Sequence, residues 1–325
     1  MTSRPHFQKL VERARLRAPL TAAVVFPCDR EALQMALSGA FAGYLRPTLV
    51  GPEMRIRDIA LKAGLDISRL DMIDTPDDAR AAGVRAVELA RDGEVAALIK
   101  GSLAKEDLLN PVVAQDSGLR TERRLSHAYF LDLPDQPRGH VLADAQMNVA
   151  PNLAAKRDIV VNTIQLATAL GIASPNVALL AAMDGPATGF PSTMDAVALR
   201  VMAQQGKFPG AKVEGPLTPD AALSADVARA RGVQSEIAGQ VDVLVAPAME
   251  SALMVLRTML ALGGGLAAGL VLGARVPIVV PARYDTMEVR MASCVLASLF
   301  SSWLFDASKS DQSTLARDTG TRAAA

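Results

Sequence analysis

The sequence predicts an α/β fold with helices on both faces of a parallel or mixed sheet, and three observations support this prediction. Short apolar runs recur along the chain, and each is followed by a longer segment with helical spacing of its apolar residues. Half of the residues are apolar, which is enough for a sizeable core. The chain has 325 residues, more than one typical domain, so two α/β domains are expected.

The first unit lies near the N-terminus. Residues 21–26 are an apolar run, and a helical segment follows with Leu33, Leu37 and Phe41 on one face. Residues 47–51 then predict a second strand. A strand, a helix and a strand in this order form a crossover connection, so the two strands are expected to be parallel.

Later apolar runs continue this alternation. They predict strands over residues 95–101, 140–148, 176–184, 241–247 and 276–283. Helices are expected between them, over residues 154–172, around 226–239 and over 250–262. The polar stretch 114–128 is the best hint of a boundary between the early and the late units. The apolar stretch 291–305 predicts a core helix or a dimer interface.

Composition narrows the class of partner. Lysines and arginines number 34, and so do aspartates and glutamates, which argues against nucleic acid or an anionic membrane and favours a small-molecule ligand. Two cysteines are too few for a disulfide framework, and three scattered histidines offer no metal-ligand spacing. No stretch reaches the roughly 20 apolar residues of a membrane span, and the N-terminus lacks an apolar signal segment. A cytoplasmic protein is therefore expected.

Ligands of open α/β sheets gather beyond the carboxyl ends of the strands. Lys100, Gly101 and Ser102 lie at such an end, just before a predicted helix. A glycine lets backbone N–H groups approach a ligand, and a lysine beside a helix N-terminus suits an anion such as phosphate. An ordinary strand-to-helix turn with a solvated lysine explains the same residues, so both interpretations stay open.

Polar side chains in two further apolar runs are candidates. Ser126 and His127 are adjacent, but no nucleophile elbow or acid accompanies them, so hydrogen bonding is expected instead of a catalytic triad. Asp144 and Asn148 lie inside or at the end of a run, where a buried carboxylate must find donors or lose its charge. Asp144 is therefore either a structural cap or a site residue.

The run 276–283 ends in a group of charged residues. Arg283 can bind a phosphate through two parallel hydrogen bonds, and Asp285 or Glu288 can orient it or accept a proton. The alternative is a surface pair of arginine and aspartate, which contributes almost nothing to the free energy of folding. The glycine-rich run 263–269 follows a helical pattern instead of a strand, so a dinucleotide-binding loop is rejected.

Several stretches occur along the chain in a fixed order. They are KGSLAKEDLL, RRLSHAYFLD, LADAQMNVAPNLAAKRDIVVNTI, VALLAAMD, FPSTMDAVALRVMAQQGKFPGAKVEGPLTPDAALS, GVQSEIAGQVDVLVAP and GARVPIVVPARYDT. In this order they resemble the phosphate acetyl/butyryltransferase family, especially its butyryltransferase-like branch. The resemblance covers residues 21–300, and EGPLTPDAALS followed by SEIAGQVDVLVAP is its most specific part.

The resemblance implies an isopropylmalate/isocitrate dehydrogenase-like fold of two α/β domains with a cleft between them. The first domain is expected to be discontinuous, with residues 1–142 and 290–325, and the second to contain residues 143–289. A homodimer is implied, which moves a short acyl group, acetyl to butyryl, between coenzyme A and inorganic phosphate in a ternary complex. Coenzyme A is then a substrate, and no metal or redox cofactor takes part in the chemistry.

The resemblance also assigns roles to residues. Arg283 matches the arginine that binds phosphate in the family, and Asp285 or Glu288 is expected to be its orienter or the base. The other expected site residues are Asp144, as a polar cleft position, and the substrate-binding residues Lys100, Gly101, Ser102, Ser126, His127, Asn148, Glu250 and Arg257.

The chain departs from the family pattern at several polar positions. Ala282 stands where a serine usually precedes the arginine, Ala248 and Leu253 stand where relatives carry polar residues, and Lys105 and Asn110 replace a threonine and an arginine. Two interpretations follow: an active acyltransferase, or a weakened family member that binds an acyl-CoA or a partner enzyme without turnover. A metal- and NAD-dependent dehydrogenase is disfavoured, because the aspartates are too dispersed to hold a divalent metal.

Overall fold

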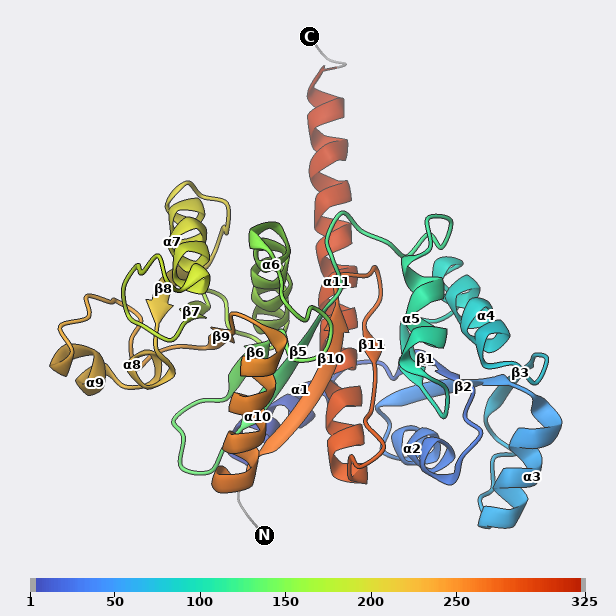
Figure 1. Ribbon diagram of the computed structural model, residues 1–325. Coiled ribbons are helices and arrows are strands. Elements are labelled where there is room, and N and C mark those ends of the chain that lie inside the picture. The colour runs from blue at the N-terminus through green and yellow to red at the C-terminus, as the bar shows by residue number, and fades with distance from the viewer. Residues whose placement is uncertain (1–3, 323–325) are drawn as a thin grey trace.

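The chain folds around one large sheet with helices on both faces (Figure 1). A computed structural model describes residues 4–322, with side chains as far as Lys309. Within this part the strands form an 11-stranded sheet in the order β3-β2-β1-β4-β11-β10-β5-β6-β9-β7-β8. The predicted α/β class with a mixed sheet is confirmed, while the predicted division into two domains stays a prediction.

The elements alternate along most of the chain. The strands are β1 (Leu20–Val25), β2 (Leu45–Gly51), β3 (Asp71–Asp74), β4 (Ala97–Lys100), β5 (Ser126–Asp132), β6 (His140–Ala143), β7 (Asn176–Leu180), β8 (Lys212–Leu217), β9 (Val243–Val245), β10 (Leu266–Leu272) and β11 (Ile278–Val279). The helices are α1 (Pro5–Arg15), α2 (Arg30–Phe41), α3 (Glu53–Ala63), α4 (Ala79–Arg91), α5 (Lys105–Val113), α6 (Leu153–Ala169), α7 (Pro191–Gln204), α8 (Pro219–Leu223), α9 (Ala225–Ala230), α10 (Met249–Gly263) and α11 (Met287–Arg322).

Strand direction reverses near the middle of the sheet. Strands β1, β2, β3, β4 and β11 pair parallel to one another, and so do β6, β7, β8 and β9. Between these groups, β10 is antiparallel to both β11 and β5, and β5 is antiparallel to β6. The two parallel groups therefore run in opposite directions, so the carboxyl ends of their strands point to opposite ends of the sheet along the strand direction.

Alternate residues of the central strands build the core on the two faces of the sheet. On β6, Val141 and Ala143 belong to the larger apolar cluster, which also contains buried residues of α6 and α11. Leu142 lies between them on the strand and belongs to a second cluster, with Ala252 and Leu256 of α10. Helices α6 and α11 thus cover one face, and α10 covers the other.

The predicted β-α-β unit at the N-terminus is confirmed. Strands β1 and β2 are parallel, with Leu20 opposite Leu45, and Asp29 caps α2 by accepting the Ala32 N–H at 2.7 Å. The predicted inner face of the helix is only partly correct. Leu33 is fully buried, but Phe41 is 96 % exposed, because α2 ends at this residue and the chain turns away to enter β2.

The helix predicted around residues 226–239 is wrong in length. Helix α9 ends at Ala230, and Gly232 has a φ of +70°, which no continuing helix adopts. The rest of the predicted segment is turn and loop.

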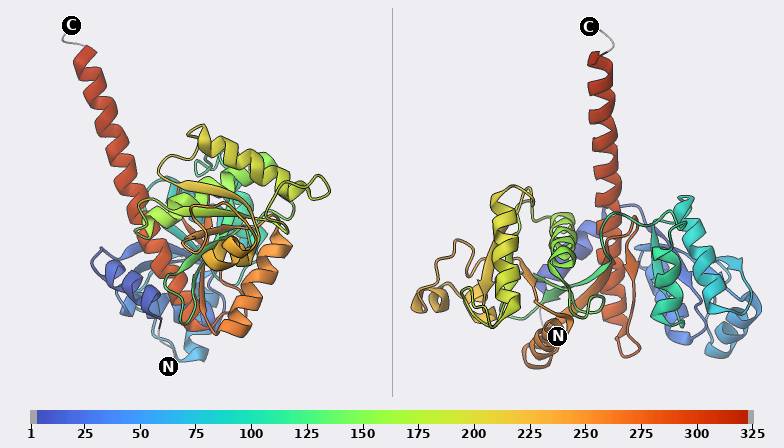
Figure 2. Two further views of the ribbon diagram at one scale, coloured as in Figure 1. Left: turned by 90° about the vertical axis from the view of Figure 1, so that its left-hand side faces the viewer. Right: turned by 45° about the horizontal axis from the view of Figure 1, so that its top comes forward.

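Helix α11 begins beside the sheet and extends beyond the rest of the fold (Figure 2). The predicted core stretch 291–305 lies in it, and Ala292, Cys294, Leu296 and Phe300 are buried. In the described part of the chain, Met287–Lys309 is long and apolar enough to cross a membrane, with a mean hydropathy of 1.3. This corrects the expectation that no stretch qualifies. Half of that stretch's most apolar window is buried within the fold, and a core helix passes the same test, so the support for a membrane span is weak.

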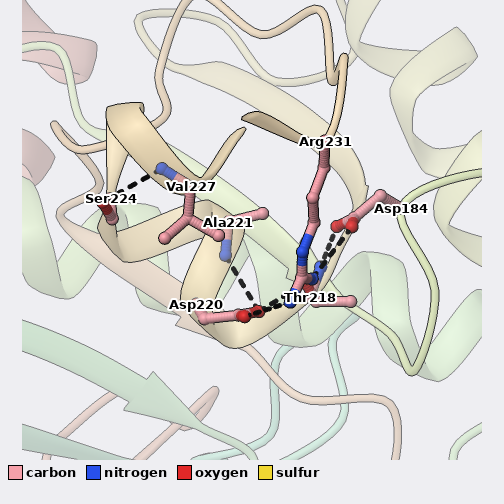
Figure 3. Close-up of polar contacts among 7 residues, drawn as sticks. All are labelled: Asp184, Thr218, Asp220, Ala221, Ser224, Val227 and Arg231. Carbon is pink, nitrogen blue, oxygen red and sulfur yellow. Dashed lines mark hydrogen bonds and ion pairs between the residues drawn. The ribbon is translucent and has the colours of Figure 1, made fainter. Parts of the chain in front are cut away.

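Arg231 links three segments on the β8 side of the sheet (Figure 3). Its guanidinium lies between Asp184, beyond β7, and Asp220, in the first turn of α8, with N–O distances of 3.3 and 2.5 Å. It also donates to the Thr218 hydroxyl at 2.9 Å, and the Thr218 N–H donates to Asp184 at 2.6 Å. The network fixes the start of α8 relative to the end of β7.

We expect Arg231→Ala to lower the free energy of unfolding by about 1 kcal/mol, because three acceptors lose one shared donor while partial exposure weakens each pair. The side chain is 45 % exposed. Arg229→Ala is the matched control: its pair with Asp226 is 77 % and 88 % exposed, so its effect should stay below about 0.5 kcal/mol. Urea unfolding of both variants measures the difference, and equal effects would contradict a specific role for the network.

Candidate active site

The candidate site is built on a tight turn that follows β11. The Asp285 N–H donates to the Ala282 carbonyl at 3.1 Å, and the Asp285 carboxylate accepts the Ala282 N–H at 2.7 Å. Arg290, in the first turns of α11, is 7 % exposed and braces this turn. Its guanidinium donates to the carbonyls of Ala282 at 3.0 Å and Asp285 at 3.2 Å. A buried cation therefore fixes the backbone on both sides of Arg283.

The Arg283 side chain lies at the surface of this turn. Residue Arg283 is exposed, and among the side chains described, up to Lys309, it has no hydrogen bond or ion pair. Its backbone is held while its guanidinium is free. The alternative of a surface pair with an aspartate is therefore not formed among these described side chains, and the guanidinium is open to an anionic ligand.

Lys100 brings a further positive charge close to the turn. Its ammonium group donates to the carbonyls of Gly101 and Leu103, both at 3.0 Å. Burial lowers the pKa of Lys100; the charge of Asp29 opposes this, and the charges of Arg290 and Arg283 lower the pKa further. Lys100 of β4, Arg283 of the turn and Arg290 of α11 therefore lie within electrostatic reach of one another. Such a group of cations favours the binding of an anion.

Asp285 is the acid of this turn, and the charge of Arg290 acts on it. Burial raises the pKa of its carboxyl group, while the Ala282 N–H and the charge of Arg290 oppose the rise. A carboxylate with a raised pKa is a better base near neutral pH than an ordinary one.

Gly101 and Ser102 join the ends of β4 and β1. A Cβ at Gly101 would lie 2.5 Å from the Val25 carbonyl oxygen, so only glycine allows this approach. The Ser102 hydroxyl donates to the Phe26 carbonyl at 3.0 Å and accepts the Cys28 N–H at 3.0 Å. Gly101 also accepts from Lys100 through its carbonyl, and the hydroxyl of Ser102 is engaged with the end of β1 and the residues after it.

Asp144 organises the loop after β6. The residue is 2 % exposed. Its Oδ1 accepts the N–H groups of His127, Gln146 and Met147, each at 3.1 Å, and its Oδ2 accepts the N–H of Asn148 at 3.0 Å. Burial raises its pKa, and the hydrogen bonds oppose the rise. These contacts favour the structural cap over direct contact with a substrate.

Two other predicted site residues lie at the start of β5. Ser126 is fully buried and its hydroxyl accepts a hydrogen bond from Asn162 at 2.9 Å. His127 is 1 % exposed, and burial, with help from Lys105, lowers its pKa to about 3. Its ring stacks at a tilt on Tyr129, with 4.5 Å between the ring centroids. His127 is therefore a neutral side chain and not a general base at neutral pH.

A cleft of about 670 Å³ lies between α5 and the loops at residues 120–125 and 147–148. Its lining includes Asn148 and Asn110, four cationic side chains, Lys105, Arg120, Arg123 and Arg124, and two acidic ones, Glu106 and Glu122, so the cationic side chains are in excess. Arg123 is held by Asn162 at 2.9 Å and Gln165 at 3.0 Å. An adjoining cavity of about 280 Å³ reaches the N-terminus of α6, where the helix dipole also favours negative charge.

The last predicted residues lie on α10 and α11. The Arg257 guanidinium donates to the Tyr284 hydroxyl at 3.1 Å, which brings α10 to the turn at Arg283. Glu250 is exposed in the first turn of α10. Glu288 forms an ion pair with Arg4 at 3.4 Å, so it joins α11 to the N-terminal segment. Asp285 is therefore better placed than Glu288 to act at the turn.

Comparison with known proteins identifies the family. The family model for phosphate acetyl/butaryl transferase matches residues 78–298, which is more than half of the chain. The chain belongs to the phosphate acetyl/butaryl transferase family. The resemblance stated from the sequence is thereby confirmed.

Individual members of this family match over most of their length. The phosphate acetyltransferase of Rhizobium meliloti is 41 % identical over 90 % of this chain and 93 % of its own. The phosphate butyryltransferase of Clostridium acetobutylicum is 31 % identical over 90 % of this chain and 97 % of its own. The fold is similar to that of a branched-chain phosphotransacylase from Enterococcus faecalis V583, with a TM-score of 0.77, 24 % identity, and coverage of 87 % of this chain and 99 % of that one.

Within the described residues of this family member, no group of three or more His, Cys, Asp or Glu side chains is placed to hold a metal ion.

Two residues near the turn were missed from the sequence. Arg290 was seen only as part of a charged stretch, without its role, and Tyr129 was not singled out. Alternation along β5 puts Tyr129 on the same face as His127, and this signal could have found it.

Proposed function

We propose that this protein transfers a short acyl group, acetyl to butyryl, between coenzyme A and inorganic phosphate in a ternary complex. The observation that carries the proposal is the free guanidinium of Arg283 on a turn braced by buried Arg290, beside Lys100. Relatives named phosphate acetyltransferase and phosphate butyryltransferase support it.

The phosphate has a site at the turn. Arg283 can bind two of its oxygens through parallel N–H donors, and Lys100 adds a point charge. The chain's own residues thus offset the charge of both inorganic phosphate and the phosphate of an acyl phosphate.

The cationic cleft suits the phosphate groups of coenzyme A. Arg120, Arg123 and Arg124 line it together with Lys105. The Lys105 ammonium donates to the Gln146 carbonyl at 3.1 Å. Gln146 also donates from its side chain to Tyr129, and the charge of Asp285 acts on Tyr129 in turn. These hydrogen bonds lead from the cleft to Tyr129, which lies within electrostatic reach of Asp285 in the turn. We propose that a coenzyme A in the cleft directs its thiol towards the acyl phosphate at the turn.

The thiol needs a base, because the thiolate is the reactive nucleophile. We assign this role to Asp285. Its raised pKa means that the protonated form persists to a higher pH than for an exposed aspartate, so kcat/KM should rise with pH through that raised pKa. Asp285→Asn should lower activity and remove this acid limb. A pH profile of both proteins measures this, and an unchanged limb in the variant would exclude Asp285 as the base.

A second candidate function is binding of an acyl-CoA without turnover. Ala282 favours it, because the turn lacks a hydroxyl at this position and the hydroxyl of Ser102 is engaged elsewhere. The removal of one preorganised donor typically lowers kcat by about 100-fold to 1,000-fold.

An assay over acyl chain lengths separates the two functions. Free thiol is measured with acetyl-, propionyl- and butyryl-CoA, with and without phosphate. Phosphate-dependent release with any of them supports the acyltransferase. Thermal stabilisation by an acyl-CoA without any release would support the binding function.

We further propose the isopropylmalate/isocitrate dehydrogenase-like form of the fold, a cytoplasmic homodimer, and chemistry without a metal or redox cofactor. The reversal of strand direction at β10 and β5 supports two domains on either side of the cleft. Sedimentation at several concentrations tests the dimer.

A further inference from the structure

The transfer reaction needs a hydrogen-bond donor for the acyl carbonyl. Attack on this carbonyl places a negative charge on its oxygen, and a fixed donor at that point is a large contribution to catalysis. The turn at Arg283 has no hydroxyl at Ala282. A hydroxyl on a neighbouring strand is a candidate for this donor.

Tyr129 packs against the apolar cluster of α10, the helix whose Arg257 contacts Tyr284 of the turn. Tyr129 is opposite Gly269 on the neighbouring strand β10. A Cβ at Gly269 would lie 2.7 Å from His127 Cε1 and 2.8 Å from Tyr129 Cε1, so both rings lean over this glycine. Asp285 and Tyr284, both of the turn, and Arg257 of α10 are close enough to Tyr129 for their charges to act on it.

The hydrogen bonding of Tyr129 leaves its own hydrogen available. The phenol oxygen accepts from the Gln146 side-chain amide, Nε2, at 2.5 Å. Among the side chains that the structure describes, which end at Lys309, no acceptor takes the hydroxyl hydrogen. The Gln146 backbone is fixed at both ends, by Lys105 at its carbonyl and Asp144 at its N–H. The phenol is thus oriented and free to donate.

We propose that the Tyr129 hydroxyl donates a hydrogen bond to the acyl carbonyl oxygen during transfer, in place of a hydroxyl at position 282. The inference rests on the proposed acyl transfer and adds a catalytic residue to it. Burial, with the nearby Asp285 and Tyr284, raises the pKa of Tyr129, so the hydroxyl keeps its proton at neutral pH.

The bonds and charges of the step balance. Asp285 takes the thiol proton, and the sulfur forms a bond to the acyl carbon as the carbonyl π bond breaks. The Tyr129 O–H stabilises the resulting oxyanion. The carbonyl then re-forms as the bond from carbon to the phosphate oxygen breaks, and the phosphate leaves on Arg283 and Lys100.

Tyr129→Phe tests the inference, because it removes the hydroxyl and keeps the ring that packs on His127. We expect kcat to fall by about 100-fold, with the KM values for acyl-CoA and phosphate changed by less than about threefold, since the donor acts on charge that develops in the transition state. Tyr44→Phe is the matched control. It removes a phenol hydroxyl from a buried tyrosine just before β2 and should leave kcat unchanged.

Gln146→Glu provides a second variant that does not depend on how Tyr129→Phe folds. A carboxylate at this position would accept the phenol hydrogen and remove it from the substrate, so kcat should fall by at least about tenfold. Full kcat in both variants, with an active wild type, would overturn the inference and leave the proposed function intact. A wild type without turnover would overturn the proposed function itself.

Discussion

Arg283→Ala should lower kcat/KM for phosphate by on the order of 1,000-fold, the largest effect on activity that the structure predicts. The guanidinium is the free cation of a turn whose carbonyls are bound by buried Arg290. Its loss removes two parallel N–H donors and a charge from the phosphate, and Lys100, which already donates to two carbonyls, cannot replace them. Initial rates over a range of phosphate concentrations measure the effect.

Arg283→Lys separates charge from geometry. Lysine keeps the charge but not the planar pair of donors, so an intermediate loss of about 10-fold to 100-fold is expected. Arg200→Ala, an exposed arginine on α7, should leave the rate unchanged. An Arg283→Ala variant with more than about a tenth of wild-type kcat/KM would contradict a phosphate site at this turn.

Asp144→Ala should produce the largest loss of stability, about 3 kcal/mol or more in the free energy of unfolding. The substitution removes the shared acceptor of four backbone N–H groups, those of His127, Gln146, Met147 and Asn148. Buried donors without a partner each cost about 1–3 kcal/mol, although relaxation and water recover part of this sum. Urea unfolding with a fixed m-value measures the loss.

Two further variants test whether this loss is specific to the Asp144 carboxylate. Asp58→Ala removes an exposed pair with Lys62 and should cost less than about 0.5 kcal/mol. Asp144→Asn keeps one acceptor oxygen and should be intermediate. A loss below about 1 kcal/mol for Asp144→Ala would show that the loop after β6 does not depend on this carboxylate.

Much of the fold could be predicted because its signals are local. The period of a strand is visible in the apolar run 21–26, and the period of a helix in the segment after it. With the next apolar run these segments form β1, α2 and β2, and the two strands pair in parallel. The order of the sheet could not be predicted, since the reversal at β10 and β5 depends on pairing between residues more than a hundred positions apart. Strand β10 itself was hidden in the glycine-rich run 263–269.

The same distinction holds for the candidate site. Arg283 could be proposed from the sequence because an apolar run ends at it. The bracing role of Arg290 could not be predicted, because its partners are backbone carbonyls that only the folded turn brings together. Tyr129 and Gln146 were missed for a related reason: their contact depends on the loop that Asp144 holds after β6.

Release of free thiol from acetyl-CoA by the wild-type protein, followed with and without inorganic phosphate, tests the central claim most directly. The structure predicts release that saturates with phosphate and is matched by an equal amount of acyl phosphate. Absence of release with acetyl-, propionyl- and butyryl-CoA, or release that is the same without phosphate, would contradict it.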